Sequence, residues 1–428
     1  MKNPRLLLCI MFSSLTFSAM ADSANYLVKP TGKFNVSVIK HQLTNTNICP
    51  DYFYQESHGW FYKDTAGQDH CHRLYLYLYY PTNNKSGNYL NYYANDIPQV
   101  RSDINDKVIE SKNVHYAEEV IKHEEKVTSY VLASGEIVNQ KFPLIVFSPG
   151  MGFNSYYYQN FITNLVSHGY IVAAIDSAYN QQLYDSPNQK YLLQSPFTFE
   201  SGVSSLWQPK SNLDQASSDF NFVITQLKTN SIHDPIIKYI DFNQIGGFGQ
   251  SLGARAIYAN SVSQNTQLKA AVAMEIGRDK TLLQNNEVPI PFMFMNAANM
   301  GTSDKEYFGA PSSFNLSSNN FLIKMTPNES NTTYSSHMTF SDFSTLRYAN
   351  KLNELSNLAY NQKFSEKDFN EWYGTGDGYT FTADVNSYLV NFFDHYLKHK
   401  SSSTFTSCTA LNKTSLIICG DDKGKHYP

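Results

Sequence analysis

Short apolar runs that alternate with segments of helical periodicity constrain the fold of this chain more than any other feature. These runs begin after Phe142 and cover residues 144–147, 171–175, 245–248, 270–274, 292–295 and 321–325. Runs of this length without polar alternation predict buried parallel strands, because such strands are covered by helices on both faces. Residues 161–166, 216–227 and 382–398, which lie between or after the runs, repeat apolar residues at helical spacing. The order strand, helix, strand predicts an open α/β sheet.

The part before Phe142 follows a different pattern. Strands are expected from Lys33 to Lys40 and from Arg73 to Tyr80, and we interpret them as an antiparallel edge of the sheet. Residues 83–140 are polar and rich in Asn and Tyr, which predicts a surface insertion. Residues 177–213 follow a strand and are too long for a simple connection, so they form either a lid or a plain surface excursion. The sequence shows no internal repeat and no long linker, which favours one domain over residues 22–400.

The first 21 residues are typical of a cleavable signal peptide. Lys2 and Arg5 precede an apolar run, and the small residues Ala19 and Ala21 stand where cleavage is expected. A lipoprotein signal at Cys9 is the weaker alternative, because this cysteine comes early and follows a bulky leucine. We therefore expect a secreted or periplasmic protein.

The charge of the chain excludes one class of partner. Loss of Lys2 and Arg5 with the signal changes the formal net charge from -4 to -6 (-4 - 2 = -6), and no dense basic run is present. Nucleic acid is therefore not expected as a partner. No later stretch approaches the roughly 20 apolar residues that a membrane-spanning helix requires.

Cys49, Cys71, Cys408 and Cys419 remain after removal of the signal. An even number of cysteines in an oxidising compartment predicts disulfides. Pairing of neighbours, Cys49–Cys71 and Cys408–Cys419, is our hypothesis among the three possible connectivities. The second pair lies in a polar tail at residues 401–428. A metal site at His70, Cys71 and His72 is disfavoured, because adjacent side chains on extended backbone point to opposite faces.

The stretch GFGQSLGAR, at residues 247–255, has the pattern Gly-x-Ser-x-Gly centred on Ser251. It follows an apolar strand and precedes a helix-forming segment, as in the sharp turn that exposes a nucleophilic serine. Such a turn leaves room only for small residues two positions before and after the serine, here Gly249 and Gly253. The context predicts that Ser251 is a nucleophile.

A serine nucleophile needs a base and an acid, which follow it along the chain in this arrangement. His337 lies in a loop after the strand at residues 321–325, where a base would reach the sheet edge, whereas His395, His399 and His426 fall on the last helix or in the tail. The acid is left open between Glu275, which ends the strand at 270–274, and Asp304, with Asp279 as a weaker choice.

The transition state of such a serine enzyme carries an oxyanion, which two backbone N–H groups usually bind. One is expected from Leu252, directly after the nucleophile. The other is expected from Met151, which stands between Gly150 and Gly152 in the stretch FSPGMGF at residues 147–153.

Several separated stretches resemble the platelet-activating factor acetylhydrolases and related bacterial esterases of the α/β-hydrolase fold. They are PTGKFNV (30–36), RLYLYLYYPT (73–82), FPLIVFSPGMG (142–152), SHGYIVAAID (167–176), GFGQSLGA, AAVAME (270–275), SSHMTFSDF (335–343) and FFDHYLK (392–398). The resemblance implies a serine esterase that acts on phospholipid, lysophospholipid or short acyl lipid esters without a metal or other cofactor, with transient contact with a lipid surface. It matches Ser251 with the nucleophile, His337 with the base, Glu275 with the acid, and Met151 and Leu252 with the oxyanion donors.

The sequence departs from the family pattern at three positions. Glu275 stands where the family usually has aspartate, Pro149 replaces a histidine before the oxyanion glycine, and Gln250 replaces a histidine before the serine. The resemblance therefore does not fix the substrate. A cutinase-like, polyester or carbohydrate-ester hydrolase is an alternative, because fold and triad do not determine the leaving group. A catalytically inactive binding protein with an aromatic surface is the alternative from another class, since the chain contains 31 tyrosines.

Overall fold

The computed structural model describes residues 26–47, 72–84, 87–92, 127–177, 183–185, 190–192, 212–276, 288–298, 319–327, 330–331, 333–349, 370–371, 373–420 and 426–427. The expected signal peptide, the expected Cys49–Cys71 pair and the alternative acids Asp304 and Asp279 lie outside these residues.

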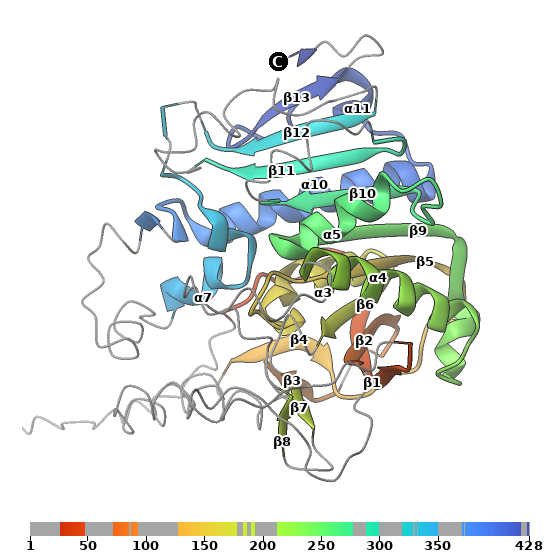
Figure 1. Cartoon of the computed structure of the whole chain (residues 1–428). Coiled ribbons are helices and arrows are strands. Elements are labelled where there is room, and N and C mark those ends of the chain that lie inside the picture. The colour runs from red at the N-terminus through yellow and green to blue at the C-terminus, as the bar shows by residue number, and fades with distance from the viewer. Residues whose placement is uncertain are drawn as a thin grey trace, which may run out of the picture.

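One sheet of twelve strands runs through the described part of the chain, in the order β14-β13-β12-β11-β10-β9-β5-β6-β2-β1-β4-β3 (Figure 1). Its strands are β1 (Asn35–Asn45), β2 (His72–Thr82), β3 (Tyr89–Asn91), β4 (Thr128–Leu132), β5 (Phe142–Ser148), β6 (Ile171–Ser177), β9 (Ile240–Gln250), β10 (Ala270–Met274), β11 (Phe292–Ala297), β12 (Asn320–Met325), β13 (Leu416–Gly420) and β14 (His426–Tyr427). The six neighbours from β12 to β6 pair in parallel, which confirms the prediction from the apolar runs. Strand β2 pairs antiparallel with both β1 and β6, which confirms the antiparallel edge.

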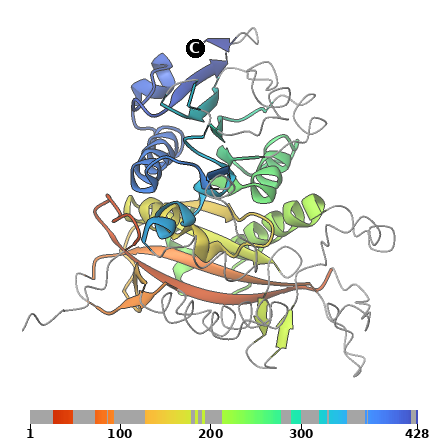
Figure 2. The ribbon, with the colours of Figure 1, turned by 90° about the vertical axis from the view of Figure 1, so that its left-hand side faces the viewer.

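Helices cover both faces of this sheet, as Figure 2 shows from the side. The helices α3 (Gln159–Ser167) and α10 (Gly378–Lys398) pack on one face, and α4 (Asn212–Lys228) and α5 (Leu252–Ser261) pack on the other. Successive residues of a strand point to opposite faces. Accordingly, Ile145 and Phe147 pack with α3 and α10, while Leu144 and Val146 pack with α4 and α5. None of the helices described is long and apolar enough to cross a membrane.

The two ends of the segment at residues 83–140 belong to the sheet. Strand β4 pairs in parallel with β1 and antiparallel with β3, and Val131 on β4 is buried. The structure therefore corrects the interpretation of the whole segment as a surface insertion. The apolar pattern did not predict these strands because they contain polar residues. One of these residues, Ser129 on β4, is buried and donates its hydroxyl to the carbonyl of Leu90 on β3.

The tail at residues 401–428 is also part of the domain, which corrects its interpretation as a separate polar segment. Strand β13 pairs antiparallel with β12, and the short helix α11 (Ser403–Ser407) places Phe405 against Phe321 of β12 at 4.9 Å between ring centroids. The predicted Cys408–Cys419 disulfide is present and joins the end of α11 to β13. The sequence analysis assigned β13 to the tail because polar residues flank its short apolar run on both sides.

The segment at residues 177–213 contributes a separate two-stranded hairpin, β7 (Leu183–Asp185) and β8 (Lys190–Leu192). Residues 178–182, 186–189 and 193–211 lie outside the described residues. The expectation of a lid at this position therefore stays a prediction.

Candidate active site

Ser251 lies at the sharp turn between β9 and α5, near the middle of the sheet. Its backbone has φ 54° and ψ -116°, in a region that side chains other than glycine rarely adopt. The N–H of Ser251 donates to the carbonyl of Met274, the last residue of β10, at 3.0 Å. The strained turn presents the serine at the carboxyl end of the parallel strands, as in the nucleophile turn of the α/β hydrolases.

The glycines two residues on either side of Ser251 are required by close backbone contacts. A Cβ atom on Gly249 would lie 2.6 Å from the carbonyl carbon of Gly253. A Cβ atom on Gly253 would overlap the carbonyl oxygen of Ser148, which ends β5. The spacing of the motif is therefore a steric requirement of three backbone segments that meet beside Ser251.

The loop after β5 (residues 149–153, here the glycine loop) lies beside this turn. A Cβ atom on Gly150 would be 3.4 Å from the Cβ of Ser251, and the backbone of Gly152 has φ 81°. The half-buried Met151 packs with the buried cluster that contains Leu252, the first residue of α5. The structure thus brings Met151 and Leu252 together next to Ser251. Helix N-termini present unpaired N–H groups and a partial positive charge, which favours an anion at this place.

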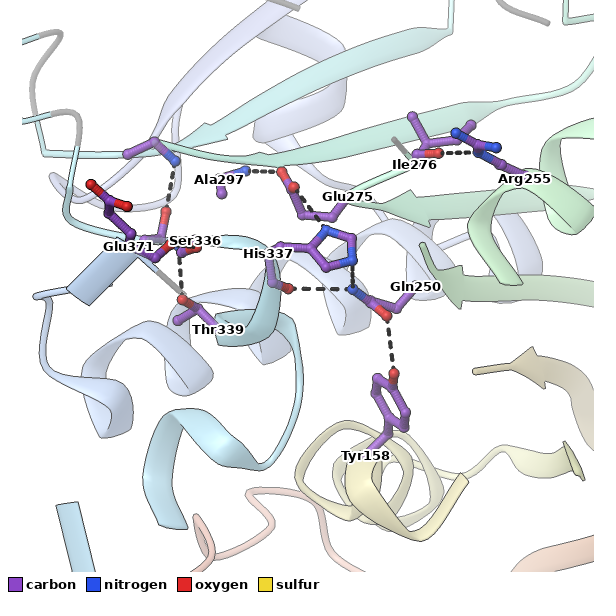
Figure 3. Close-up of polar contacts among 12 residues, drawn as sticks. Tyr158, Gln250, Arg255, Glu275, Ile276, Ala297, Ser336, His337, Thr339 and Glu371 are labelled. Carbon is purple, nitrogen blue, oxygen red and sulfur yellow. Dashed lines mark hydrogen bonds and ion pairs between the residues drawn. The ribbon is translucent and has the colours of Figure 1, made fainter. Parts of the chain in front are cut away.

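His337 and Glu275 come together at the same edge of the sheet (Figure 3). Glu275 directly follows β10 with φ 48°, and its Oε2 lies 3.3 Å from Nδ1 of His337. Its other oxygen, Oε1, accepts a hydrogen bond from the N–H of Ala297 at the end of β11, at 2.5 Å. The side chain of Glu275 is 11% exposed and that of His337 is 40% exposed. The carboxylate is therefore held between the N–H of Ala297 and the ring of His337, and the imidazole is partly exposed.

The second ring nitrogen of His337 contacts a residue that the sequence did not single out as part of the site. Nε2 of His337 lies 3.1 Å from Nε2 of Gln250, the residue before the serine. Among the described residues, no hydrogen bond joins His337 to Ser251. Catalytic hydrogen bonds are often long or unformed in proteins without substrate, and they tighten in the complex. The position of Gln250 directly before Ser251 is visible in the sequence, but the direction of its side chain could not be derived from the sequence.

The loop that carries His337 (residues 335–343, here the His337 loop) is held by the ends of two strands. The hydroxyl of Ser335 donates to the carbonyl of Met325 at the end of β12, at 2.6 Å, and accepts from the N–H of Ala298 after β11, at 2.8 Å. Thr339 accepts from the N–H of Ser336 and donates to the carbonyl of Tyr373. These bonds fix the His337 loop at the edge of the sheet where Glu275 follows β10.

Asp342 ties the far end of the His337 loop to α3, and sequence analysis missed it. The carboxylate accepts hydrogen bonds from the N–H groups of Gln159 and Asn160 and from the hydroxyl of Tyr92. It caps the helix N-terminus, where a negative charge is favourable. Burial raises the pKa of Asp342 to about 7, although its hydrogen bonds with Tyr92 and the two N–H groups act in the opposite direction.

Replacement of Asp342 by asparagine is expected to change the pH dependence of stability. Because the folded-state pKa is raised from 3.8 to about 7, the contribution of this group is fully present below about pH 4 and is lost as the pH rises toward 7. An asparagine side chain cannot ionise, so the decrease of the melting temperature between pH 4 and 7 should be smaller in Asp342→Asn than in the wild type. Thermal unfolding at pH 4, 5.5 and 7 measures this. Asp241→Asn, which changes a carboxylate in a local turn, is the control and should keep the wild-type slope.

Replacement of Glu275 by glutamine is expected to lower ester hydrolysis by about 10²–10⁴ in kcat. A glutamine has one acceptor oxygen, whereas Glu275 faces two donors, the N–H of Ala297 and Nδ1 of His337. One of these contacts must be lost, and with it the orientation of the imidazole. Steady-state kinetics of Glu275→Gln measures the effect. The control is Glu371→Gln, which changes an exposed carboxylate near the His337 loop. Equal kcat values for the two variants would contradict a role of Glu275.

Among the described residues, no group of three or more His, Cys, Asp or Glu side chains could hold a metal ion. At this edge of the sheet, Ser251 directly follows Gln250, whose side chain contacts His337, and His337 contacts Glu275.

Known proteins resemble this chain in sequence over its first part and in fold over most of its length. The sequence profile of the family described as platelet-activating factor acetylhydrolase, isoform II, matches residues 20–184. This match contains the glycine loop and ends before Ser251. A ferulic acid esterase from Streptomyces cinnamoneus has a similar solved structure, with a TM-score of 0.64 and 18% sequence identity over 91% of this chain and 98% of that chain. No curated protein matches the sequence.

The sheet order, the serine turn and the structural neighbour define the class of fold as that of the α/β hydrolases. Within this class, the chain resembles the platelet-activating factor acetylhydrolases over the matched residues, as predicted from its sequence.

Proposed function

We propose that this protein is a serine carboxylester hydrolase with Ser251 as nucleophile, His337 as base and Glu275 as acid. The observation that carries the proposal is the contact of Nδ1 of His337 with Oε2 of Glu275, at the same sheet edge as the strained turn of Ser251. A carboxylate on Nδ1 orients the imidazole and leaves Nε2 to accept a proton. The family resemblance and the fold neighbour both support ester hydrolysis.

The reaction follows from these positions. His337 accepts the proton of the Ser251 hydroxyl on Nε2, and the serine oxygen forms a bond with the ester carbonyl carbon. The N–H groups of Met151 and Leu252 bind the resulting oxyanion. The carbon–oxygen bond to the alcohol breaks, and His337 returns the proton to the alcohol as it leaves. Water then loses a proton to His337 and attacks the acyl-enzyme, which releases the carboxylic acid and restores Ser251.

Phospholipid, lysophospholipid or short acyl lipid esters are the substrates that the resemblance to the platelet-activating factor acetylhydrolases supports. Esters of carbohydrates are a second candidate, because the structural neighbour is named as a ferulic acid esterase. Lipid esters and carbohydrate esters differ in the acyl group and in the alcohol that the ester bond joins. They share the same chemistry at Ser251, so only a direct comparison of substrates distinguishes them.

A panel of esters tests the proposal. The purified protein is assayed with p-nitrophenyl acetate and butyrate, with 2-acetyl and long-chain phosphatidylcholines, with methyl ferulate and with acetylated xylan, and Ser251→Ala serves as the blank for each. A kcat/KM at least tenfold higher for the 2-acetyl phospholipid than for methyl ferulate would support the lipid class, and the reverse would support the carbohydrate class. No hydrolysis above the blank in any assay would overturn the proposal in favour of a binding protein.

Secretion is proposed from the sequence of residues 1–21. The intact mass of protein recovered from the periplasm or medium of an expressing cell tests it. A mass that begins at Asp22 is expected, and a chain that keeps Met1 or stays in the cytoplasm would contradict the proposal.

A further inference from the structure

Gln250 is buried at the end of β9, and its side-chain amide makes three polar contacts through both of its polar atoms. Its Oε1 lies 3.0 Å from the hydroxyl of Tyr158. Its Nε2 lies 3.3 Å from the backbone oxygen of His337 and 3.1 Å from Nε2 of the same residue. The amide therefore spans the space between the His337 loop and Tyr158, which lies just before α3 (Figure 3).

The two outer contacts of this row, at Gly150 and at the backbone oxygen of His337, fix the direction of the hydrogen bonds between them. The N–H of Gly150 donates to the hydroxyl oxygen of Tyr158 at 3.2 Å, so Tyr158 uses its own proton toward Oε1 of Gln250. Burial holds the pKa of Tyr158 above its ordinary value, which keeps the phenol protonated. At the other end, the backbone oxygen of His337 can only accept, so Nε2 of Gln250 must face His337.

The same direction determines the protonation of the imidazole. Nε2 of Gln250 carries two protons, of which one points to the backbone oxygen of His337 and the other to its ring Nε2. The ring Nε2 must then be an acceptor without a proton. In a neutral imidazole the proton is on the other nitrogen, Nδ1, which faces the carboxylate of Glu275. This is the tautomer that a general base for Ser251 requires.

We propose that Gln250 is a positioning residue that fixes the tautomer of His337 and connects the His337 loop, through Tyr158, to the glycine loop. The inference rests on the proposed function, since a base is needed only if Ser251 reacts. During the reaction the hydroxyl of Ser251 takes the place of the Gln250 amide at Nε2, while the bond from Gln250 to the backbone oxygen keeps the loop in place. The absence of a side chain on Gly150 belongs to this arrangement, because a Cβ there would overlap Oε1 of Gln250.

The other titratable groups near His337 in the described structure do not compete for Nε2. Glu275 contacts Nδ1, and Asp342 on the same loop turns its carboxylate to the N-terminus of α3. Arg255 donates through Nε to the carbonyl of Ile276. Glu371 is exposed, and its backbone oxygen accepts a hydrogen bond from Ser336. A change at Gln250 is therefore the direct way to alter the environment of Nε2.

The first test reads the tautomer without turnover. Protein labelled with ¹⁵N-histidine is studied by long-range ¹H–¹⁵N correlation at neutral pH, and His337→Ala identifies the signals of His337. The wild type is expected to carry the proton on Nδ1, and Gln250→Met is expected to give a mixture of tautomers or a larger protonated fraction. A proton on Nε2 in the wild type, or the same spectrum in Gln250→Met, would overturn the inference.

The second test reads the reaction. Gln250→Met keeps an unbranched side chain of similar size but removes the donors, so kcat is expected to fall about tenfold with little change in KM. The acid limb of the kcat/KM profile should move to higher pH by about half to one unit, because the neutral imidazole loses a donor hydrogen bond. Gln244→Met is the matched control, since Gln244 lies on the same strand and its side chain contacts the distant His399. It should keep the wild-type profile.

Tyr158→Phe is a second variant that tests the same contacts if Gln250→Met does not fold. The ring still packs against Phe147, whose centroid lies 4.9 Å away, and only the hydroxyl between Gly150 and Gln250 is lost. The kinetic changes should have the same direction as in Gln250→Met, and unchanged kinetics would contradict the connection through Tyr158. If the wild type formed no covalent adduct at Ser251 with a fluorophosphonate, the proposed function would fail, while the tautomer measurement would still decide the role of Gln250.

Discussion

Replacement of Ser251 by alanine is expected to lower kcat/KM for ester hydrolysis by a factor of about 10⁴ or more, because the proposed reaction forms the acyl-enzyme on the Ser251 hydroxyl. Alanine has a Cβ atom as serine does, so the backbone strain at φ 54° should be the same in the variant. The substitution should therefore remove the nucleophile without unfolding the turn. Ser263→Ala, which changes an exposed serine shortly after α5, is the matched control and should retain full activity.

The same pair of variants gives a second readout that does not depend on the choice of substrate. An alkyl fluorophosphonate should add one phosphonyl group to the wild type and to Ser263→Ala, and none to Ser251→Ala, as measured by intact mass. An adduct on Ser251→Ala would mean that another residue is the nucleophile. A wild type without an adduct would favour the alternative of a binding protein that keeps the fold.

Replacement of His337 by alanine should have an effect almost as large, about 10³–10⁴ or more in kcat, because the nucleophile and its base act as a unit. The side chain is 40% exposed and contacts Glu275 and Gln250, so the loss of packing is small and the melting temperature should change little. His395→Ala is the control, since His395 lies on α10 and contacts the carbonyl of Lys400. Equal kinetics for the two variants would rule out His337 as the base.

The parallel centre of the fold could be predicted from the sequence because the same physical property defines each of its strands. Strands covered on both faces need apolar residues at nearly every position, and β5, β6 and β9 to β12 contain such runs. Strands β3, β4 and β13 could not be found in this way. Polar residues lie within or beside these strands, and each strand forms only against a partner strand. Buried polar groups such as Ser129 are stabilised by backbone contacts that lie far away in the sequence.

The candidate site was predictable where local sequence dictates geometry. Gly249 and Gly253 identify the turn of Ser251 because close backbone contacts allow no side chain there. Glu275 and His337 follow strands, which places them at one edge of the sheet. The contacts of Gln250 with Tyr158, and of Asp342 with α3, could not be derived, since each joins segments more than ninety residues apart.

Strand β13 has a consequence for how the chain is made. A ribosome synthesises β12 before residues 326–415 and only then reaches β13, which pairs with β12 through four residue pairs. Until that moment β12, with the sequence NFLIKM, offers an unpaired apolar edge to other nascent chains. The Cys408–Cys419 bond then keeps β13 tied to the neighbouring helix α11. Production in an oxidising compartment, and at a rate that limits the number of unfinished chains, would therefore favour recovery of monodisperse protein.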